Sequence, residues 1–428
     1  MNAESVKASG IEWIGDVPAH WELKRLKYTS TLAGRIGWQG LTSEEYRTEG
    51  VHLVTGTDFN DGGIDWESCV RVTEARWAEA TQVQLQEGDL LITKDGTVGK
   101  IAICRNMPNK ASLNSGVMVI RQKLPMSTRF LYWVLDSPVF WGWFSDVNAG
   151  ASTIAHLYQA DFYNFGFYVP PTVQEQEQVA AVLDVETAKI DRALNLLEQE
   201  LVTLEQLKKS LIHEAVTKGL DPAVPMKPSG VGWIGDIPEH WEVRRLKFVL
   251  NNFDYLRMPV EASERSRLGD TLFPFYGASG VIDHIDRFNV EGESILVGED
   301  GANLVSRNLP IAYFAEGRYW VNNHAHILRP KAGSMRYYFY TLEACDYAPF
   351  ITGSAQPKLS QRNLNDVYLP VPLSMAEQEQ IAADLQRSLE DISRVFDLKL
   401  EQLDLLKQRR QSIIFEYVTG KRRVSEVA

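Results

Sequence analysis

Two long stretches of the chain carry apolar residues at spacings of three and four, or seven, positions. This is the a/d pattern of a coiled coil, so each stretch is predicted to be one long helix. Basic residues interrupt the two apolar seams at Lys208, Lys399 and Arg410. The apolar seam positions, which we expect to bind the partner helix, are Leu183, Ile190, Leu194, Leu197, Leu201, Leu204, Leu211, Leu385, Leu389, Ile392, Phe396, Leu403, Leu406 and Ile413.

The two seams could be buried in two ways. Each helix could lie on the surface of its own domain, or the helices could pair with each other. Equivalent seams in one chain favour pairing. A whole domain separates the helices, so the sequence permits either orientation. An antiparallel pair with an internal twofold is favoured because it buries both seams symmetrically.

The remaining sequence has a different pattern, with short β-rich runs separated by turn signals. Runs predicted to be strands are residues 51–55, 89–93, 100–104, 116–121, 294–297, 311–314 and 324–329. Helical stretches follow them at residues 128–144 and 335–345. The predicted fold class is therefore α+β, with two mixed α/β domains joined by two long helices that form an antiparallel coiled coil with an internal pseudo-twofold repeat.

The chain contains an internal repeat. Residues 10–29 and 230–249 are identical at twelve of twenty positions. The sequence Glu-Gln-Glu-Gln at residues 175–178 recurs at residues 377–380, which lie at the start of the predicted helices. The ends of the two repeats match well and their middles match poorly. This pattern indicates a fixed frame that holds two different recognition regions, which we call readers.

Turn signals and the repeat set the predicted domain boundaries. The stretch after Lys218 contains a C-cap glycine and several prolines, which indicates a linker. The predicted segments are a first mixed domain at 1–170, a central helical region at 171–218, a linker at 219–230, a second mixed domain at 231–370, a C-terminal helical region at 371–420 and a tail at 421–428.

Composition narrows the class of protein. The net charge is -12 and the pI is about 5.3, which argues against a polybasic nucleic-acid binder, since such domains usually have a pI above about 9. The three cysteines are far apart, so neither a disulfide framework nor a cysteine zinc site is expected. No run approaches the roughly 18 apolar residues of a membrane span, and the N-terminus does not resemble a signal peptide. We therefore expect a cytoplasmic protein without a membrane partner.

A polar turn at residues 93–100 joins two predicted strands. It does not match a P-loop, because position 101 is Ile where that motif needs Ser or Thr. The turn is either a plain tight hairpin or a loop that contacts DNA. For the second case the candidate contacts are Lys94, Thr97 and Lys100.

A second pair of polar segments lies at residues 150–157 and 353–359. Small residues with hydroxyl and basic side chains allow a backbone to approach an anionic polymer closely. A plain loop is the alternative. The candidate DNA contacts in and beside these segments are Ser152, Thr153, His156, Ser354, Gln356, Lys358 and Arg362.

Other motifs receive a structural interpretation. The repeated tryptophans of residues 13–21 and 233–241 could stack on bases, but they are expected to fix the start of each repeat to its body. His324 and His326 are expected on one face of a strand, without a third ligand, so no metal site is predicted. No catalytic triad, dinucleotide fingerprint or adenine-methyltransferase motif is found. The sequence predicts no catalytic residue.

These features together resemble the specificity subunit of type I restriction-modification enzymes. The resemblance is carried by residues 232–243 with their copy at 10–23, by residues 296–301, by residues 353–363, by residues 370–381 and by residues 210–222. It covers essentially the whole chain. The first copy departs from the family pattern at residues 152–156, where a Gln-x-Lys is more usual.

The resemblance implies that the two mixed domains are target-recognition domains for double-stranded DNA. It implies partners as well: two methyltransferase subunits that hold S-adenosylmethionine, and restriction subunits that translocate DNA with ATP and Mg²⁺. It implies no cofactor and no catalysis in this chain. The expected function is to read a bipartite, asymmetric DNA target and to scaffold these subunits. The alternative is a coiled-coil interaction scaffold that does not read DNA.

Overall fold

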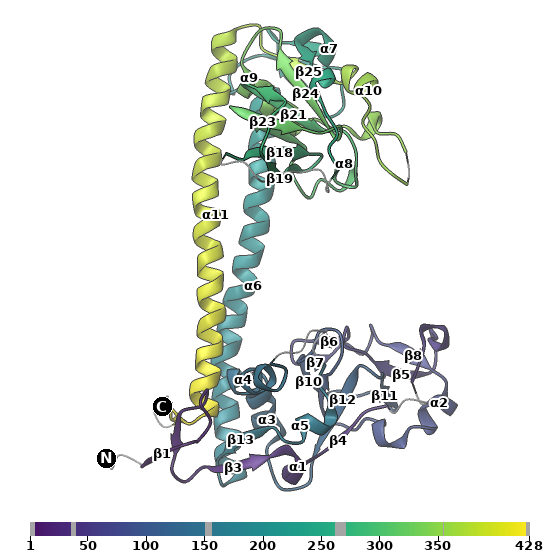
Figure 1. The fold of residues 1–428 in the computed structure, drawn as a ribbon, viewed down its shortest axis with the longest axis vertical. Coiled ribbons are helices and arrows are strands. Elements are labelled where there is room, and N and C mark those ends of the chain that lie inside the picture. The colour runs from purple at the N-terminus through teal and green to yellow at the C-terminus, as the bar shows by residue number, and fades with distance from the viewer. Residues whose placement is uncertain (1–4, 36–39, 150–155, 262–270, 354, 425–428) are drawn as a thin grey trace. The chain divides into compact units, whose positions relative to one another are not determined.

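The computed structural model describes residues 5–35, 40–149, 156–261, 271–353 and 355–424. Contacts divide the chain into two compact units (Figure 1). Unit 1 comprises residues 1–197 and 401–428, and unit 2 comprises residues 198–400. Each unit combines one mixed domain with a stretch of the two long helices α6 (Val173–Lys218) and α11 (Met375–Val418).

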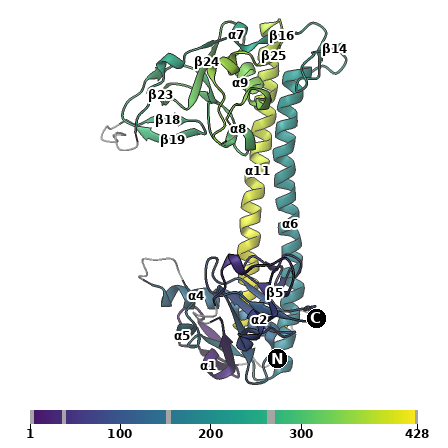
Figure 2. The same cartoon turned by 90° about the vertical axis from the view of Figure 1, so that its right-hand side faces the viewer.

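The two long helices run in opposite directions within each unit. Unit 1 contains the beginning of α6 and the end of α11, and unit 2 contains the end of α6 and the beginning of α11. The helices lie side by side in each unit in both views (Figures 1 and 2). All fourteen apolar seam positions are buried or half-buried. The predicted antiparallel coiled coil is therefore confirmed.

Ion pairs occupy two of the basic interruptions in the seam. In unit 1 the Arg410 guanidinium contacts Asp136 Oδ2 through Nη1 and Asp191 Oδ1 through Nε, both at 2.8 Å. In unit 2 the Lys399 Nζ lies 2.5 Å from Glu200 Oε2. Because charged side chains are costly to bury without a partner, these pairs explain how the seam accommodates basic residues.

The mixed domain of unit 1 is built on a four-stranded antiparallel sheet in the order β10-β9-β12-β4. A separate three-stranded sheet has the order β11-β5-β8. The strands of these sheets are β4 (Ser30–Ala33), β5 (Val51–Val54), β8 (Val70–Val72), β9 (Leu90–Thr93), β10 (Ile101–Ile103), β11 (Ala111–Leu113) and β12 (Val117–Gln122).

The mixed domain of unit 2 repeats the first sheet and not the second. Its first sheet has the order β22-β21-β24-β17, again all antiparallel, and its second sheet has the order β19-β18-β23-β20. The strands are β17 (Leu250–Asn252), β18 (Phe273–Gly277), β19 (Gly280–Ile285), β20 (Val290–Glu291), β21 (Ser294–Gly298), β22 (Ala312–Ala315), β23 (Arg318–Val321) and β24 (Ala325–Pro330).

The two ends of each mixed domain hold each other, which explains why the ends of the repeats match. In unit 1, β3 (Glu22–Arg25) pairs with β13 (Gly166–Val169). In unit 2, β16 (Glu242–Arg245) pairs with β25 (Tyr368–Val371). Residues that are far apart in sequence therefore form one closed frame, and the chain between them is free to differ.

The repeated tryptophans and the Glu-Gln pairs fix each frame to a long helix. Trp21 Nε1 donates to Glu175 Oε1 at 3.0 Å, and Trp241 Nε1 donates to Glu377 Oε1 at 2.9 Å. Both indoles are buried. The next residue, Gln176, accepts the Ser127 N–H and donates to the Pro170 carbonyl. Its repeat copy, Gln378, makes the same two contacts with Ser334 and Pro372. The structural interpretation of the tryptophan motif is confirmed.

Shorter elements complete the two units. Hairpins precede each frame, and short helices lie between the strands. They are β1 (Val6–Ala8), β2 (Asp16–Pro18), α1 (Leu26–Thr29), β6 (Phe59–Asn60), β7 (Gly63–Ile64), α2 (Glu74–Ala78), α5 (Gln159–Phe162), β14 (Met226–Pro228), β15 (Asp236–Pro238), α7 (Leu246–Val249), α8 (Asn303–Ser306) and α10 (Gln361–Asn365). Strand β14 lies within the stretch that was predicted to be a linker.

The helices next to the first sheets correct one prediction. Residues 128–144 were expected to form one helix, but the structure has two, α3 (Thr128–Leu135) and α4 (Pro138–Val147). Pro138 has no N–H to continue a helix, and the Ser137 side chain accepts the Val139 N–H as an N-cap. The corresponding prediction in unit 2 is confirmed by α9 (Met335–Ala344).

Among the described residues, no helix is both long enough and apolar enough to cross a membrane.

Candidate nucleic-acid interface

The turn between β9 and β10 presents polar side chains at the edge of the first sheet of unit 1. Thr93 closes the turn: its hydroxyl donates to the Thr97 carbonyl at 2.5 Å and accepts the Lys100 N–H at 2.9 Å. Thr97 and Lys100 are exposed, and Lys100 Nζ donates to the Gly56 carbonyl at 3.3 Å. The segment is a tight turn that leaves a hydroxyl and an ammonium facing solvent.

A distant predicted segment lies against this turn. The Leu157 N–H donates to the Lys94 carbonyl at 3.0 Å, and His156 Nδ1 pairs with the Asp95 carboxylate. Lys94 is half-buried, and His156 is only partly exposed. Two separately predicted segments are therefore one surface. Two further candidates of that segment, Ser152 and Thr153, lie outside the described residues.

Unit 2 builds the corresponding contact from different side chains. The Leu359 N–H donates to the Glu299 carbonyl at 2.7 Å, as Leu157 does to Lys94. Lys358 exchanges two backbone hydrogen bonds with Thr352, and its Nζ lies 3.2 Å from Glu299 Oε1. Gln356 is exposed on the same loop, and Ser354 lies outside the described residues. A carboxylate therefore stands where unit 1 has a lysine.

Arg362 lies on a different element from the other candidates of unit 2. It is exposed on α10, whose N-cap Ser360 accepts the Asn363 N–H at 3.3 Å. The helix follows the Lys358 loop directly, so a contact from Arg362 would extend the same edge along the chain.

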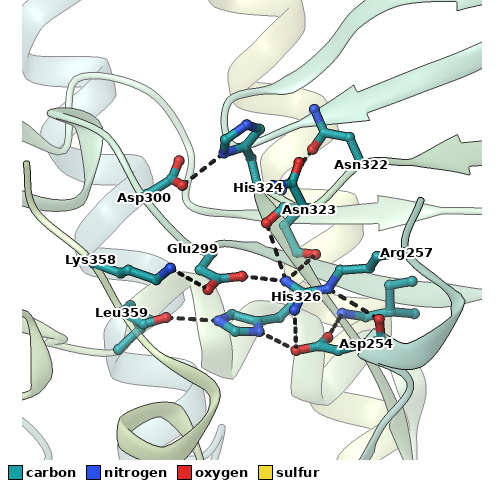
Figure 3. Close-up of polar contacts among 12 residues, drawn as sticks. Asp254, Arg257, Glu299, Asp300, Asn322, Asn323, His324, His326, Lys358 and Leu359 are labelled. Atoms are coloured by element: carbon teal, nitrogen blue, oxygen red, sulfur yellow. Dashed lines mark hydrogen bonds and ion pairs between the residues drawn. The ribbon is translucent and has the colours of Figure 1, made fainter. Parts of the chain in front are cut away.

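A buried histidine fixes the Lys358 loop to the sheet (Figure 3). His326 is fully buried; its Nδ1 lies 2.6 Å from Asp254 Oδ2 and its Nε2 lies 2.8 Å from the Leu359 carbonyl. Both partners are hydrogen-bond acceptors, so both ring nitrogens donate. The imidazole therefore joins β24 to the loop from one side and to residue 254 from the other.

Charged groups around His326 form a network under the loop. Arg257 contacts Glu299 and lies 3.3 Å from Asp254 Oδ2 (Figure 3). Burial opposes ionisation of both carboxyl groups, but the hydrogen bond from His326 lowers the pKa of Asp254 below its ordinary value. The Arg257 hydrogen bond lowers the pKa of Glu299 in the same way. The network holds its carboxylates in the charged form.

The histidine pair was placed wrongly from the sequence. His326 lies in β24, but His324 lies in the turn before that strand, where its Nδ1 is 2.7 Å from Asp300 Oδ2. The two rings bind different carboxylates and do not face a common ligand. Among the described ranges, no group of three or more His, Cys, Asp or Glu side chains could hold a metal ion.

Several residues of this surface escaped the sequence prediction. Asp95 and Asp300 stand in Asp-Gly turns that occur after β9 and after β21, and that repetition was visible in the sequence. Asp254 gave no such signal, because it lies 72 residues from His326. Only the sheet order brings those two residues together.

The same protein family matches both halves of the chain. A family model described as the type I restriction modification DNA specificity domain matches residues 42–206 and 238–402. The specificity subunit S.HindORF215P of Haemophilus influenzae is 32% identical over 132 residues, which are 31% of this chain and 33% of that protein. The type I restriction enzyme MjaVIII specificity subunit of Methanocaldococcus jannaschii is 22% identical over 96% of this chain and 95% of its own length.

A solved structure has the same fold. It comes from work on complex assembly and conformational transition of the type I R-M system, and its chain superposes with a TM-score of 0.71 at 16% identity. The match covers 95% of this chain and 99% of that chain. Since the family model matches most of both halves, this chain belongs to the family of type I restriction-modification specificity subunits, with one DNA specificity domain in each half.

Proposed function

We propose that this chain reads double-stranded DNA and that each unit recognises one half of a bipartite, asymmetric target. One observation carries the proposal: the two units share a closed frame and a first sheet with equivalent strand order, but they differ in the second sheet and in the side chains at the edge. The shared frame is suited to contact the phosphate backbone, which is the same in any two DNA segments. The differing edges suit two different base sequences.

The chain acts as a scaffold and not as a catalyst. Its repeated frame offers two equivalent surfaces, which suits two copies of one methyltransferase subunit, and restriction subunits would join the same complex. S-adenosylmethionine, ATP and Mg²⁺ would be bound by those partners. The matched solved structure supports assembly, since its own subject is complex assembly of a type I system.

Exchange of the mixed domain of unit 1 tests whether each unit reads its own half-site. Residues 10–168 are replaced by those of another family member, and the hybrid is expressed with its methyltransferase partner. Sequencing of methylated sites in the host is expected to show one new half-site and one unchanged half-site. A change in both half-sites would overturn the assignment of one reader to each unit.

The alternative function is a coiled-coil scaffold that does not touch DNA, and the net charge of -12 favours it. A gel-shift titration in increasing salt, with and without the methyltransferase partner, separates the two. Sequence-specific binding that weakens with salt supports the reader, whereas absence of any shift in the full complex supports the scaffold. The purified chain alone is expected neither to methylate nor to cleave DNA.

A further inference from the structure

The Asp-Gly turns after β9 and β21 occupy the same place in the two units. The Leu157 and Leu359 N–H groups donate to the carbonyls of the residues just before the two aspartates. This contact makes Asp95 of unit 1 and Asp300 of unit 2 equivalent. The glycine that follows each aspartate has a positive φ, +67° at Gly96 and +101° at Gly301, which side chains rarely tolerate.

Each of these aspartates holds one imidazole, but the imidazoles come from different parts of the chain. His156 belongs to the segment before α5, and its Nδ1 pairs with Asp95. His324 belongs to the turn between β23 and β24, and its Nδ1 lies 2.7 Å from Asp300 Oδ2 (Figure 3). A common aspartate thus receives a histidine from two unrelated segments. The aspartates occupy equivalent turns of the two first sheets, whereas the two histidines reach them from positions that are not equivalent.

The carboxylate fixes the direction of each ring. A carboxylate only accepts hydrogen bonds, so Nδ1 carries the proton that it donates to the aspartate. Nε2 lies on the opposite side of the ring and faces away from the carboxylate. The side chains of His156 and His324 are 29% and 45% exposed, so each ring is held at one nitrogen and still reaches the surface.

We propose that these two imidazoles read bases, one in each half-site, through Nε2. The inference rests on the proposed function and adds a specificity-determining residue to each reader. In a neutral ring whose Nδ1 is protonated, Nε2 is an acceptor. Its partner in the major groove is an exocyclic amino group, adenine N6 or cytosine N4.

A base contact fits this geometry better than a phosphate contact. A phosphate would stand close to the negative charge of Asp95 or Asp300, which disfavours its approach. A fixed ring direction matters for a directional hydrogen bond to a base edge and adds little to a charge contact.

Asp95 and Asp300 are positioning residues in this proposal, since they act through the rings. An asparagine can still accept the Nδ1–H through its Oδ1, whereas an alanine cannot. Asp300→Asn is therefore expected to keep the base preference of the second half-site. Asp300→Ala is expected to lose it in the same way as removal of the ring.

The test uses the full chain expressed with its methyltransferase partner, and it sequences the methylated sites. His324→Ala is expected to relax one position of the second half-site about two- to tenfold, as the loss of one neutral hydrogen bond predicts. His156→Ala is expected to relax one position of the first half-site by a similar factor. In each variant the other half-site is the internal control. His240→Ala, which removes an exposed ring of unit 2 that pairs with Glu377 of the long helix, is a matched control and is expected to leave the motif unchanged.

Salt dependence distinguishes a base from a phosphate. The slope of binding affinity against salt is expected to stay the same in His324→Ala and His156→Ala. A salt slope that falls by about one unit with an unchanged motif would mean a phosphate contact and would overturn the proposal. Variants in which both the motif and the salt slope are unchanged would also overturn it. Hydrogen exchange confirms that each variant is folded. If the unaltered chain yields no bipartite motif, the proposed function itself is wrong. If the unaltered chain yields a bipartite motif and the histidine variants do not change it, only the histidine assignment is wrong.

Discussion

Units 1 and 2 build the same sheet around different interiors. Met118 lies opposite Ile92 in the ladder of β12 and β9, and His326 lies opposite Val297 in the corresponding ladder of β24 and β21. Both Met118 and His326 are fully buried. Methionine can offer only packing contacts there, whereas His326 binds a carboxylate and a backbone carbonyl.

The difference shows that the two first sheets share backbone positions but attach the Lys358 loop and its counterpart in unit 1 by different side chains. Unit 2 attaches the Lys358 loop with buried charges, and those charges are tolerable only because each has a partner. Unit 1 attaches the corresponding segment through a backbone hydrogen bond and a partly exposed contact between His156 and Asp95. Two readers can therefore share one frame and still respond differently to mutation, acid and salt.

The largest effects are expected where the units are alike. Trp21→Ala and Trp241→Ala each remove a buried indole from the same place in the frame, so each is expected to destabilise its own unit by about 3–5 kcal/mol. Urea titration followed by hydrogen exchange reports the two units separately. Trp141→Ala is the control, since that side chain is 40% exposed. Costs that differ by more than about 2 kcal/mol between the two variants would contradict an equivalent frame.

The next effect contrasts equivalent basic positions of the seam. Arg410 is ion-paired to Asp136 and Asp191, with 19% of its side chain exposed. Arg410→Met is expected to cost about 2–3 kcal/mol, less than for a fully buried pair because solvent screens part of the interaction. Lys208, at the equivalent place in unit 2, acts on the Glu343 carboxyl only through a minor Coulombic interaction, so Lys208→Met is expected to cost less, about 0.5 kcal/mol. Equal losses of unfolding free energy in the two variants, measured by urea unfolding, would contradict this contrast.

Acid is expected to weaken unit 2 before unit 1. The pKa values of Asp254 and Glu299 are lowered in the folded protein, mainly by His326 and Arg257 acting against burial. A lowered folded pKa gives stability that is present above the unfolded pKa, about 4, and is lost as the pH falls through the folded pKa. Hydrogen exchange between pH 6 and pH 3 measures this for each unit. Asp254→Asn is the control and is expected to flatten the acid response of unit 2; an unchanged response would refute the assignment.

The smallest effect concerns the exposed lysines. Lys100→Ala in unit 1 is expected to lower the salt slope of DNA binding by about one unit, as the loss of one phosphate contact does. Lys358→Ala in unit 2 is expected to lower it less, because Glu299 already offsets part of that charge. Binding is measured with the methyltransferase partner present. If neither variant changes affinity or slope, the assignment of these lysines to DNA contact is wrong.

Much of the architecture could be predicted because it depends on local patterns. The heptad seams gave both long helices, and the β-rich runs gave the core strands of both first sheets. The one predicted helix that proved to be two failed at Pro138, where the apolar pattern continued but the backbone could not. The second sheets were largely missed: of their strands, only β5 coincides with a predicted run, residues 51–55.

The sequence by itself determined that the chain has two repeats with a common frame, since identical ends and heptad seams are properties of residues read in order. Only the tertiary structure decided which side chains meet. Asp254 and His326 are 72 residues apart, and His156 and His324 reach equivalent aspartates from unrelated segments. Such contacts depend on strand order and ladder register, which bring together residues that no local pattern connects.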